Sequence, residues 1–506
     1  RSNFSTSDIA TIKYDPSGNE LWMARYDGPA HLEDVALAIT LDSIGNVYVT
    51  GDSWDPMDIW PFYPMSDYVT IKYDPFGNEL WAARYNGPGY SSDSPNAIAV
   101  DLLGNVYVTG SSYEYLDDFA TIKYDPSGNE LWVARYNSPG NHNDHAKEIA
   151  LDSMGNVYVT GYTDSEGSDY DYMTIAYDTD GNELWTAKYD GPVNGRDYSN
   201  AIVIDQFDNI YVTGYSDSKP LPYPNGNSDY ATIKYDSNGN QLWVARYNGP
   251  GNDNDYGVAL TLDSLGNIYV TGSSHGNGTY RDYATVAYDP SGTELWVARY
   301  NGPTNTYERA EDIAADSSGN IYVTGDGGET QDSDYTTIAY DSLGNQLWVA
   351  NYNGPGNDRD EVFDMALDVH GNVYVTGRSS GGGSGWESLD CATIKYSHPW
   401  VRPKASIDID PDTLNLKSKG RWITCYIDLP FGYDVNDIEI ETVILEEVIP
   451  SEWGDIQNTT LMVKFDRSEV EDMLSPGTYN LKVTGEFTDG TVFEGYSDEI
   501  RVIGPP

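Results

Sequence analysis

Loops rich in asparagine and aspartate carry side-chain oxygens that suit a hard metal ion. Loops 248–255 and 353–360 combine such residues with glycine and proline. Ca²⁺ binds about six to eight oxygen ligands, but no D-x-[DN]-x-[DN]-G loop occurs, so ordinary polar turns are the simpler explanation. No other cofactor is expected. The candidate Ca²⁺ ligands are Asn252, Asp253, Asp255, Asn357, Asp358 and Asp360.

Aromatic residues occur beside aspartate and asparagine in a second set of loops, which differ in length and sequence from one another. Exposed aromatic rings in such loops could stack on sugar rings or contact a protein surface. Packing within their own long loops would explain them equally well. The candidate ligand-binding residues are Trp54, Trp60, Tyr63, Tyr113, Tyr115, Tyr223, Tyr280 and Trp386.

Catalytic motifs are absent from the sequence. It contains no nucleophile elbow, no H-E-x-x-H, no phosphate-binding loop and no histidine cluster with metal-ligand spacing. His142 and His145 flank Asp144 in a predicted loop, where histidines are more often solvated than ligands. We therefore expect no catalytic residues and no enzymatic activity.

All of these loops belong to seven near-copies of one sequence unit within residues 1–398. The phrase G-N-[EQ]-L-W-x-A-[RK]-Y occurs seven times with slight variation, and [AT]-T-[IV]-[KA]-Y occurs eight times. A repeat of about 50 to 60 residues is typical of an array or a propeller. The phrase D-x-x-G-N-[VI]-Y-V-T-G starts at Asp42, Asp101, Asp152, Asp263, Asp316 and Asp368, with a variant at Asp205.

Each unit contains four short β signals separated by turn residues. In one unit they are 97–100, 106–109, 120–124 and 131–136, all rich in β-branched and aromatic residues. Four antiparallel strands per repeat predict a seven-bladed β-propeller. The first-to-second and third-to-fourth links share one rim and are nearly uniform. The candidate aromatic and Asn/Asp loops share the other rim.

Residues Asp101–Trp132 resemble the secreted β-propeller repeat proteins of the SBBP type, found in bacteria and archaea. The matching pattern is D-x-x-G-N-[VI]-Y-V-T-G followed by D-[YF]-x-T-[IV]-K-Y-[DN]-x-x-G-x-x-x-W. The resemblance covers about residues 8–397 and implies the propeller fold. It implies very little about activity, because a shared fold does not carry a shared function.

A second domain is expected at residues 404–506, after a linker at residues 399–403. Alternating segments and turns over about 100 residues suggest an immunoglobulin-like sandwich. Ile407–Thr424 also resembles a C-terminal module of exported archaeal and bacterial proteins. The two cysteines, Cys391 and Cys425, fall one in each domain. They are either buried free thiols or an interdomain disulfide.

The chain carries 80 acidic and 28 basic residues, which gives a formal net charge of −52. This charge would repel nucleic acid and anionic lipid, so neither is an expected partner. No apolar run reaches the ~20 residues of a membrane-spanning helix. The sequence begins at Arg1, so we expect a removed signal peptide and an extracellular or cell-surface location. Candidate glycosylation sites are Asn3, Asn277 and Asn458.

Eight third-strand phrases compete for seven third-strand positions. We expect the fourth-strand segment Leu21–Tyr26 to close the propeller against Ala392–Tyr396, which leaves the first third-strand phrase surplus. A surplus strand can pair within its own chain or enter a neighbouring copy. The candidate assembly strand is Ile9, Ala10, Thr11, Ile12, Lys13 and Tyr14.

Two functions follow from these expectations. The first is a non-catalytic, exported structural or adhesive protein that forms a cell-surface or extracellular filament-like homopolymer by strand exchange, since head-to-tail exchange gives fibres. The alternative is a monomeric module that binds a surface glycan or protein through the variable rim. Composition and repeats do not identify the ligand.

Overall fold

A computed structural model describes most of the chain. The described ranges are residues 7–55, 65–88, 91–165, 169–219, 227–303, 305–329, 332–369, 371–381, 389–396, 404–411, 413–416, 420–429, 433–446, 448–457, 459–488 and 492–504. The chain divides into two compact units. The first consists of residues 1–315, 319–363 and 378–390, and the second of residues 316–318, 364–377 and 391–506.

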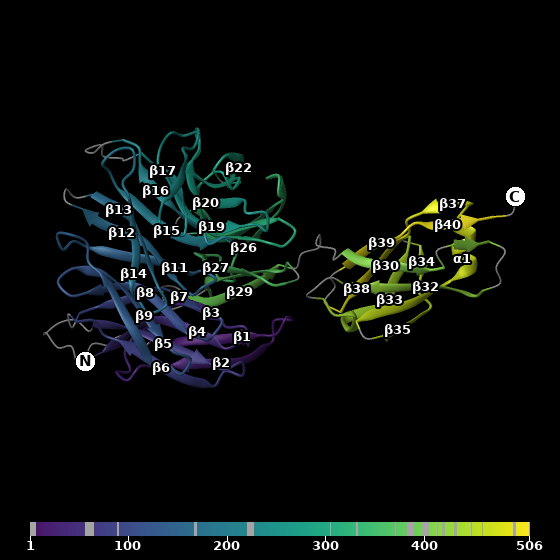
Figure 1. Cartoon of the computed structure of the whole chain (residues 1–506), viewed down its shortest axis with the longest axis horizontal. Helices are drawn as coiled ribbons and strands as arrows, with labels where there is room; N and C mark the ends of the chain where they lie inside the picture. Colours follow the sequence, from purple (N-terminus) through teal and green to yellow (C-terminus); the bar gives the residue numbers. More distant parts are fainter. Residues whose placement is uncertain are drawn as a thin grey trace. The chain divides into compact units, whose positions relative to one another are not determined.

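Six four-stranded antiparallel sheets succeed one another along the first unit (Figure 1). The first two are β3 (Asp34–Leu41), β4 (Val47–Asp55), β5 (Met65–Tyr73), β6 (Glu79–Tyr85), and β7 (Asp93–Val100), β8 (Val106–Tyr113), β9 (Asp117–Tyr124), β10 (Glu130–Tyr136). The next two are β11 (Asp144–Leu151), β12 (Val157–Ser165), β13 (Asp169–Tyr177), β14 (Glu183–Tyr189), and β15 (Asp197–Ile204), β16 (Ile210–Asp217), β17 (Ser228–Tyr235), β18 (Gln241–Tyr247). The last two are β19 (Asp255–Leu262), β20 (Ile268–His275), β21 (Arg281–Tyr288), β22 (Glu294–Tyr300), and β23 (Tyr307–Ala315), β24 (Ile321–Glu329), β25 (Asp332–Tyr340), β26 (Gln346–Tyr352).

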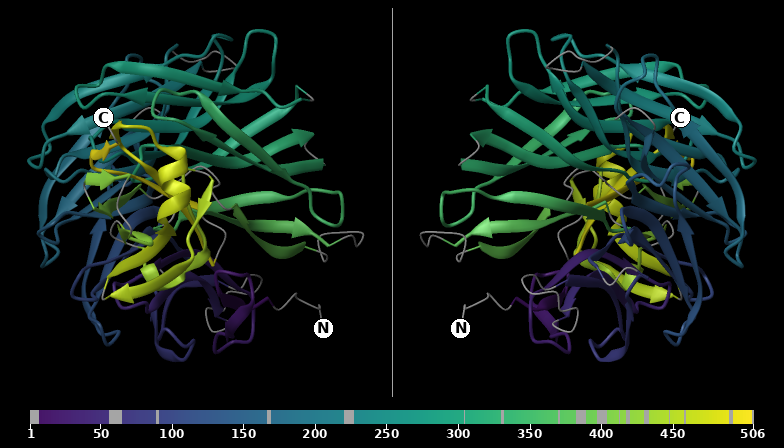
Figure 2. Two further views of the ribbon diagram at one scale, coloured as in Figure 1. Left: turned by 90° about the vertical axis from the view of Figure 1, so that its right-hand side faces the viewer. Right: turned by 90° about the vertical axis from the view of Figure 1, so that its left-hand side faces the viewer.

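These sheets are propeller blades, and the described strands match the predicted four-strand unit. Figure 2 shows them succeeding one another in sequence colour from purple to teal. Within each blade the strands lie in chain order, and each pairs antiparallel with the next. A register shift in the first strand, such as that between Ala146 and Glu148, inserts one extra residue. The first strands of neighbouring blades lie side by side.

Two smaller sheets differ from the predicted closure. Strand β2 (Glu20–Tyr26) pairs with β1 (Ile9–Tyr14), whereas β27 (Glu361–Leu367), β28 (Val373–Ser380) and β29 (Leu389–Tyr396) form a three-stranded sheet. Among the described residues, β2 therefore pairs with its own neighbour and not with Ala392–Tyr396. The local hairpin needs only a short turn, whereas the predicted pairing joins the two ends of the propeller sequence.

Strand β1 is also held by contacts with the first complete blade. The Ile9 side chain is 2% exposed and belongs to a core cluster with Val49 and Ile71. The backbone carbonyl of Ser7 accepts a hydrogen bond of 2.7 Å from the amide of Asp34. The predicted assembly strand is therefore docked on its own chain in this structure.

A tryptophan of the fourth strand joins neighbouring blades in the first six repeats. Trp132 Nε1 donates to the Thr179 carbonyl at 3.1 Å, and its ring contacts the rings of Tyr107 and Tyr177. A Cβ on Gly181, in the same turn as Thr179, would lie 2.7 Å from the Trp132 ring. These tryptophans therefore pack between blades. The same bond to the next blade is made by Trp22, Trp81, Trp185, Trp243 and Trp296.

The rim formed by the first-to-second and third-to-fourth links is here called the turn rim. In residues 125–129, the Asp125 carboxylate accepts the amides of Ser127 and Asn129 and the Asn129 side-chain amide. Gly128 has a φ of 85°, which glycine adopts without strain. In the variant turn that starts at Asp205, Asp208 takes this conformation with a φ of 58°. The uniform rim is therefore explained by turn chemistry.

The described residues of the C-terminal part of the second unit form strands and two short helices. Its eight-stranded sheet has the order β34-β33-β38-β39-β30-β32-β36-β35, and a second sheet has the order β31-β40-β37. Because β30 pairs parallel with β39, and β31 with β40, the sheets are mixed. The elements are β30 (Lys404–Asp410), β31 (Thr413–Asn415), β32 (Trp422–Asp428), η2 (Val435–Asp437), β33 (Ile438–Leu445), β34 (Ile449–Pro450), β35 (Trp453–Gln457), β36 (Thr460–Asp466), α1 (Arg467–Met473), β37 (Gly477–Tyr479), β38 (Lys482–Phe487), β39 (Val492–Ser497) and β40 (Ile500–Ile503).

Both cysteines are free thiols, so the structure does not contain the candidate disulfide between Cys391 and Cys425. Cys425 lies in the core of the C-terminal sheet with Ile427 and Val463, and burial raises the pKa of its thiol. Cys391 lies exposed in β29. Within the described ranges, no helix is long and apolar enough to cross a membrane.

Candidate binding site

The rim formed by the second-to-third and fourth-to-first links is here called the loop rim. Of the candidate aromatic residues, Trp54 is half-buried in β4, and Tyr113, Tyr115 and Tyr280 have exposed fractions of 37%, 76% and 52%. The Tyr280 ring contacts that of Tyr307 at 5.0 Å. The other candidates lie outside the described residues: Trp60, Tyr63, Tyr223 and Trp386. The structure brings none of the described four together.

The structure instead gathers another set of aromatic side chains at the loop rim, in the strands themselves. Tyr162, Tyr198, Tyr215 and Tyr256 come from β12, β15, β16 and β19, and we call them the tyrosine ladder. Their ring centroids lie 4.6, 5.1 and 4.7 Å apart in that order. The ladder therefore crosses three consecutive blades. The middle blade contributes its first and second strands, the preceding blade its second strand, and the following blade its first strand.

Further side chains extend the ladder. The His145 ring lies 5.1 Å from that of Tyr162, and Tyr170 contacts both Tyr162 and Tyr198 at 5.3 and 5.1 Å. All four ladder tyrosines are half-buried, so part of each remains accessible. Burial raises the pKa of Tyr198 to about 12, which keeps its hydroxyl protonated at neutral pH.

Repeat geometry explains why these positions meet. A ladder residue either follows the aspartate that begins a first strand, as Tyr198 follows Asp197, or follows the glycine of V-T-G, as Tyr215 follows Gly214. Cross-strand pairing places Tyr198 opposite Tyr215. The remaining corresponding positions of the six complete blades hold no tyrosine. Those positions are Val35, Asp52, Ser94, Ser111, His145, Ser273, Arg309 and Asp326.

Sequence reasoning missed the ladder because it searched the long loops. Its residues lie inside strand phrases, where a tyrosine is an ordinary strand former. A usable signal was present, since tyrosine occupies these positions only in adjacent repeats and neighbouring blades bring such positions together.

Two cations border the ladder. The Lys147 ammonium lies 5.5 Å from the centroid of the Tyr162 ring, and the Arg281 guanidinium lies 4.7 Å from that of Tyr256. Lys147 is the extra residue of the register shift in β11. At the same position in neighbouring blades, Asn96 and Asn200 donate to the carbonyl of the next first strand, at 2.6 and 2.7 Å.

Buried carboxylates support the loop rim from beneath. Asp197 and Asp255 accept the amides of Gly191 and Gly249 at 2.9 and 2.6 Å, which fixes the fourth-to-first turns. Burial raises the pKa of Asp197 to about 7, with a further contribution from Asp171 and Asp190, and raises that of Asp255 to about 6. These groups hold turns in place and are not exposed to a ligand.

The predicted Ca²⁺ ligands do not gather into one oxygen cluster. Asp255 and Asp360 are buried turn acceptors, and the Asn252 and Asn357 side-chain oxygens accept from asparagines within their turns. Asn252 and Asn357 have φ values of 49° and 48°, in the left-handed region. Asp253 and Asp358 each accept the amide of the next residue. Turn geometry therefore explains these residues.

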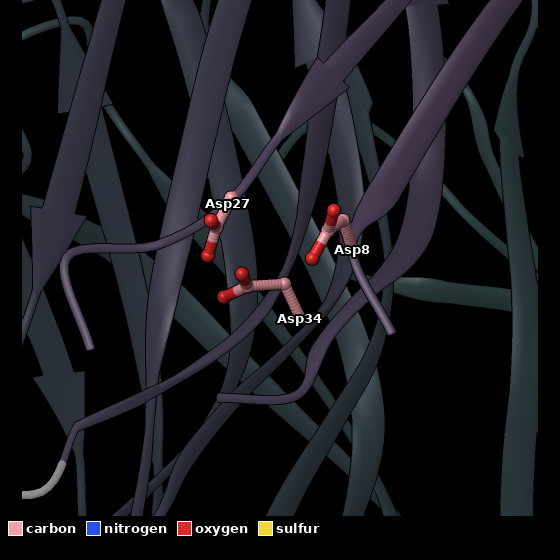
Figure 3. A group of neighbouring side chains, drawn as sticks. All are labelled: Asp8, Asp27 and Asp34. Carbon is pink, nitrogen blue, oxygen red and sulfur yellow. The ribbon is translucent and has the colours of Figure 1, made fainter. Parts of the chain in front are cut away.

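Carboxylates do cluster at two other positions of the loop rim. Asp8, Asp27 and Asp34, from the N-terminal hairpin and β3, converge as Figure 3 shows, with one oxygen of each within 4.8 Å of the others. Asp171, Asp190 and Asp197 form the second group. Both groups contain cationic neighbours, since Arg25 lies 3.9 Å from Asp8 and Lys188 lies 2.5 Å from Asp171. Neither group was predicted.

The remaining predicted positions have separate surroundings. Asp144 and His145 lie in β11 and not in a loop, so the predicted loop placement is wrong for both. His145 Nδ1 lies 3.2 Å from Ser111 Oγ and 3.7 Å from Asp117. Asn277 is exposed, which glycosylation requires, whereas Asn3 and Asn458 lie outside the described residues.

Comparison with protein families identifies the repeats. A family model described as the SBBP beta-propeller repeat matches residues 80–116, 132–168, 191–222, 242–278 and 295–330. Residues 80–330 contain SBBP beta-propeller repeats. The resemblance seen in the sequence is confirmed for this region.

Two curated proteins are similar to parts of the chain. An uncharacterized WD repeat-containing protein of Acanthamoeba polyphaga mimivirus is 24% identical over 261 residues, which is 48% of this chain and 17% of that protein. The regulatory protein FlaEY of Caulobacter vibrioides is 33% identical over 195 residues, which is 31% of this chain and 20% of that protein. The chain thus spans a fifth or less of each relative.

Solved structures give weak similarity. A periplasmic gluconolactonase of Pseudomonas aeruginosa has 15% identity and a TM-score of 0.41, over 69% of this chain and 93% of that one. A eukaryotic initiation factor has 7% identity and a TM-score of 0.40, over 78% and 85%. An ulvan lyase has 11% identity and a TM-score of 0.41, over 72% and 96%. Enzymes and non-enzymes both occur among them, so they favour neither class.

Proposed function

We propose that this protein is an exported, non-catalytic module that binds a saccharide at the loop rim of its propeller. The tyrosine ladder is the observation that carries this proposal. Its rings are held by mutual contacts, so little side-chain entropy is lost when a ligand binds. Each tyrosine offers an apolar ring and a polar hydroxyl, which complement the C–H face and the hydroxyl groups of a sugar ring.

Binding to oligosaccharides tests the proposal. We expect Tyr198→Ala to weaken binding about tenfold or more, because it removes a central ring of the ladder. Tyr496→Ala serves as the matched control, since Tyr496 is 58% exposed in β39 of the C-terminal sheets and does not belong to the propeller. Calorimetric titration would measure both. Equal losses in the two variants, or binding of a protein surface alone, would reject the saccharide assignment.

Strand exchange between copies is a second candidate function. The observation that favours it is the pair of incomplete sheets, since β1 pairs with β2 and β29 pairs with β28 among the described residues. A third strand of a complete blade pairs on both sides, as β13 does. Each incomplete sheet thus presents an edge that another strand can join.

Electron microscopy and mass photometry of the intact chain test this second function. Filaments that disappear on deletion of residues 1–14 would support it. Because Ile9 is buried on its own chain, the truncated protein must first show an unchanged melting profile of its propeller. A strictly monomeric intact chain, or filaments unaffected by the deletion, would reject strand exchange.

For the C-terminal unit we propose an immunoglobulin-like module that is separate from saccharide binding. The sequence resemblance at Ile407–Thr424 supports this assignment, and the mixed pairing of β30 and β39 is the feature that it must accommodate. An experimental structure of the whole chain would test it. A strand order that matches another sandwich family would reject it.

A further inference from the structure

Lys147 and Arg281 stand out in this chain because no carboxylate partner is observed for either among the described residues. The protein has 80 acidic and 28 basic residues, so a cation has many available partners. Most arginines of the blades are paired. Arg84, Arg135, Arg246 and Arg299 all bind an aspartate of their own blade, at 2.9, 2.8, 3.2 and 2.7 Å.

The surroundings of Lys147 are aromatic. Its ammonium lies 5.5 Å from the centroid of the Tyr162 ring, and burial lowers its pKa. A half-buried ammonium without a counterion is unfavourable, since transfer out of water penalises the charged form. A neutral residue at this position would remove the cost, and neighbouring blades have asparagine there.

Arg281 repeats this pattern beyond Tyr256. Its guanidinium lies over the Tyr256 ring, and its Nε is buried without a hydrogen-bond partner in the described structure. Arginine is suited to bidentate hydrogen bonding with a carboxylate or sulfate. The Lys147 and Arg281 side chains therefore have hydrogen-bond donors available to a ligand beside the ladder. The other arginines named above are paired with aspartates.

We propose that the tyrosine ladder selects acidic saccharides, with Lys147 and Arg281 binding carboxylate or sulfate groups on sugars that lie across the rings. This inference rests on the proposed saccharide-binding function and adds the charge of the ligand to it. Charge complementarity carries the argument, because unpaired cations flank aromatic rings in a strongly acidic protein. An ordered anion on the ligand would supply the missing counterions.

Such a ligand is repelled at long range by a chain with a net charge of −52. That repulsion is screened beyond about 8 Å at physiological ionic strength, whereas direct contact with a half-buried ammonium is screened much less. The site therefore binds acidic groups that make direct contact at the rings, and it does not attract polyanions from a distance. Affinity should be measured at about 0.15 M salt, where long-range repulsion is weak.

The test compares acidic oligosaccharides with the same oligosaccharides after reduction of their carboxyl groups. Oligomers of polygalacturonate, alginate and hyaluronan serve as probes of the intact chain in calorimetric titration. We expect at least one acidic form to bind about tenfold more tightly than its reduced form, as one charge-assisted hydrogen bond would provide. Equal affinity of the two forms in all three pairs overturns the inference.

Variants assign the preference to the two cations. We expect Lys147→Met and Arg281→Gln to bring the acidic and reduced forms close to equal affinity, while Lys147→Arg keeps the preference. Arg25→Gln is the matched control, because it removes the same charge from an exposed side chain of the N-terminal hairpin. An unchanged preference in Lys147→Met and Arg281→Gln, with their melting profiles intact, overturns the assignment.

The outcomes separate this inference from the proposed function. Ladder-dependent binding of both acidic and reduced forms with equal affinity leaves saccharide binding in place and rejects acid selection. No ladder-dependent binding of any saccharide rejects both. Poly-glutamate that binds as tightly as the acidic oligosaccharides, and depends on Tyr198, identifies an acidic protein as the ligand class and rejects saccharides.

Discussion

The two rims of the propeller use aspartate in opposite ways. On the turn rim, hydrogen bonds from Asn129 lower the pKa of the exposed Asp125, and the same holds for Asp15 and Asn19. On the loop rim, burial raises the pKa of Asp197 and Asp255. Aspartates thus stabilise exposed turns on one rim and buried fourth-to-first turns on the other. The difference shows that the exposure of a carboxyl group to solvent, more than the repeat motif around it, determines the direction of its pKa shift.

The largest expected effect is on the pH dependence of stability. Carboxyls with raised pKa values contribute stability that is fully present below their ordinary pKa of 3.8 and is lost as the pH rises to about 6 for Asp255 and about 7 for Asp197. Carboxyls with lowered pKa values, such as Asp125, contribute stability above 3.8 that is lost as the pH falls. We expect the thermal midpoint of the propeller to be highest at about pH 4, where neither loss is complete.

Tryptophan fluorescence during heating at fixed ionic strength would measure this profile. A midpoint that stays constant between pH 5 and pH 8 would contradict the buried-support role of the loop-rim carboxyls. A midpoint that does not fall below pH 3 would contradict the role of the turn-rim carboxyls.

Replacement of a fourth-strand tryptophan that packs between two blades should have the next largest effect on stability. Trp132→Ala removes a half-buried ring and its bond to Thr179, so we expect a loss of about 2–4 kcal/mol in the free energy of unfolding. Urea unfolding followed by circular dichroism would measure it. Trp453→Ala, at a 44% exposed position of the C-terminal unit, should cost far less. Similar losses of unfolding free energy in the two variants would show that the tryptophan between blades stabilises the protein no more than one at the surface.

A pair of glycine variants separates backbone strain from the blade joint. Gly18 and Gly181 occupy equivalent turns with φ values of 84° and 83°, but only at Gly181 would a Cβ meet the Trp132 ring, whereas nothing lies within 4 Å at Gly18. We expect Gly18→Ala to cost about 1 kcal/mol from strain alone, and Gly181→Ala clearly more, from the added clash. Equal costs in chemical unfolding would show that the joint does not depend on this glycine.

The smallest effect should be a gain in stability. Asp190→Asn restores the residue type of Asn86, Asn137 and Asn248 and removes a charge that raises the pKa of Asp197. We expect the free energy of unfolding to rise by about 0.5 kcal/mol at pH 8. At about pH 4 the gain should vanish, because Asp197 is then protonated. A loss of stability at pH 8 would indicate that Asp190 has a structural partner that asparagine cannot replace.

Sequence predicted what is local to one repeat. The four-strand unit and the turn at Asp125–Asn129 follow from residue types whose partners lie within a single repeat. The tyrosine ladder did not follow, because its contacts join the second strand of one blade to the first strand of the next. The signal for it was tyrosine at these positions in adjacent repeats, and this signal appears only when neighbouring repeats are compared with each other.

The predicted N-terminal closure was wrong, and of the two states left open for the cysteines the structure has free thiols. The closure and a disulfide would both require segments distant in sequence to meet, and in both cases nearer residues make the contacts instead. Strand β2 pairs with β1, and Cys425 is covered by its own sheet. Short connections cost less chain entropy than long ones. Metal ligands were predicted in turns whose asparagines and aspartates already bond to one another, as in Asn248–Asn252.

The joint between a tryptophan and the following glycine turn makes the propeller a chain of nearest-neighbour couplings. Each of these contacts involves only a tryptophan and the turn of the adjacent repeat. Duplication or loss of a whole repeat therefore leaves the contacts between the other repeats chemically unchanged. Such an architecture can vary in length by recombination without inventing a new interface. The coupling is also directional. A substitution that disturbs the glycine turn of one repeat removes the packing surface of the tryptophan side chain in the preceding repeat.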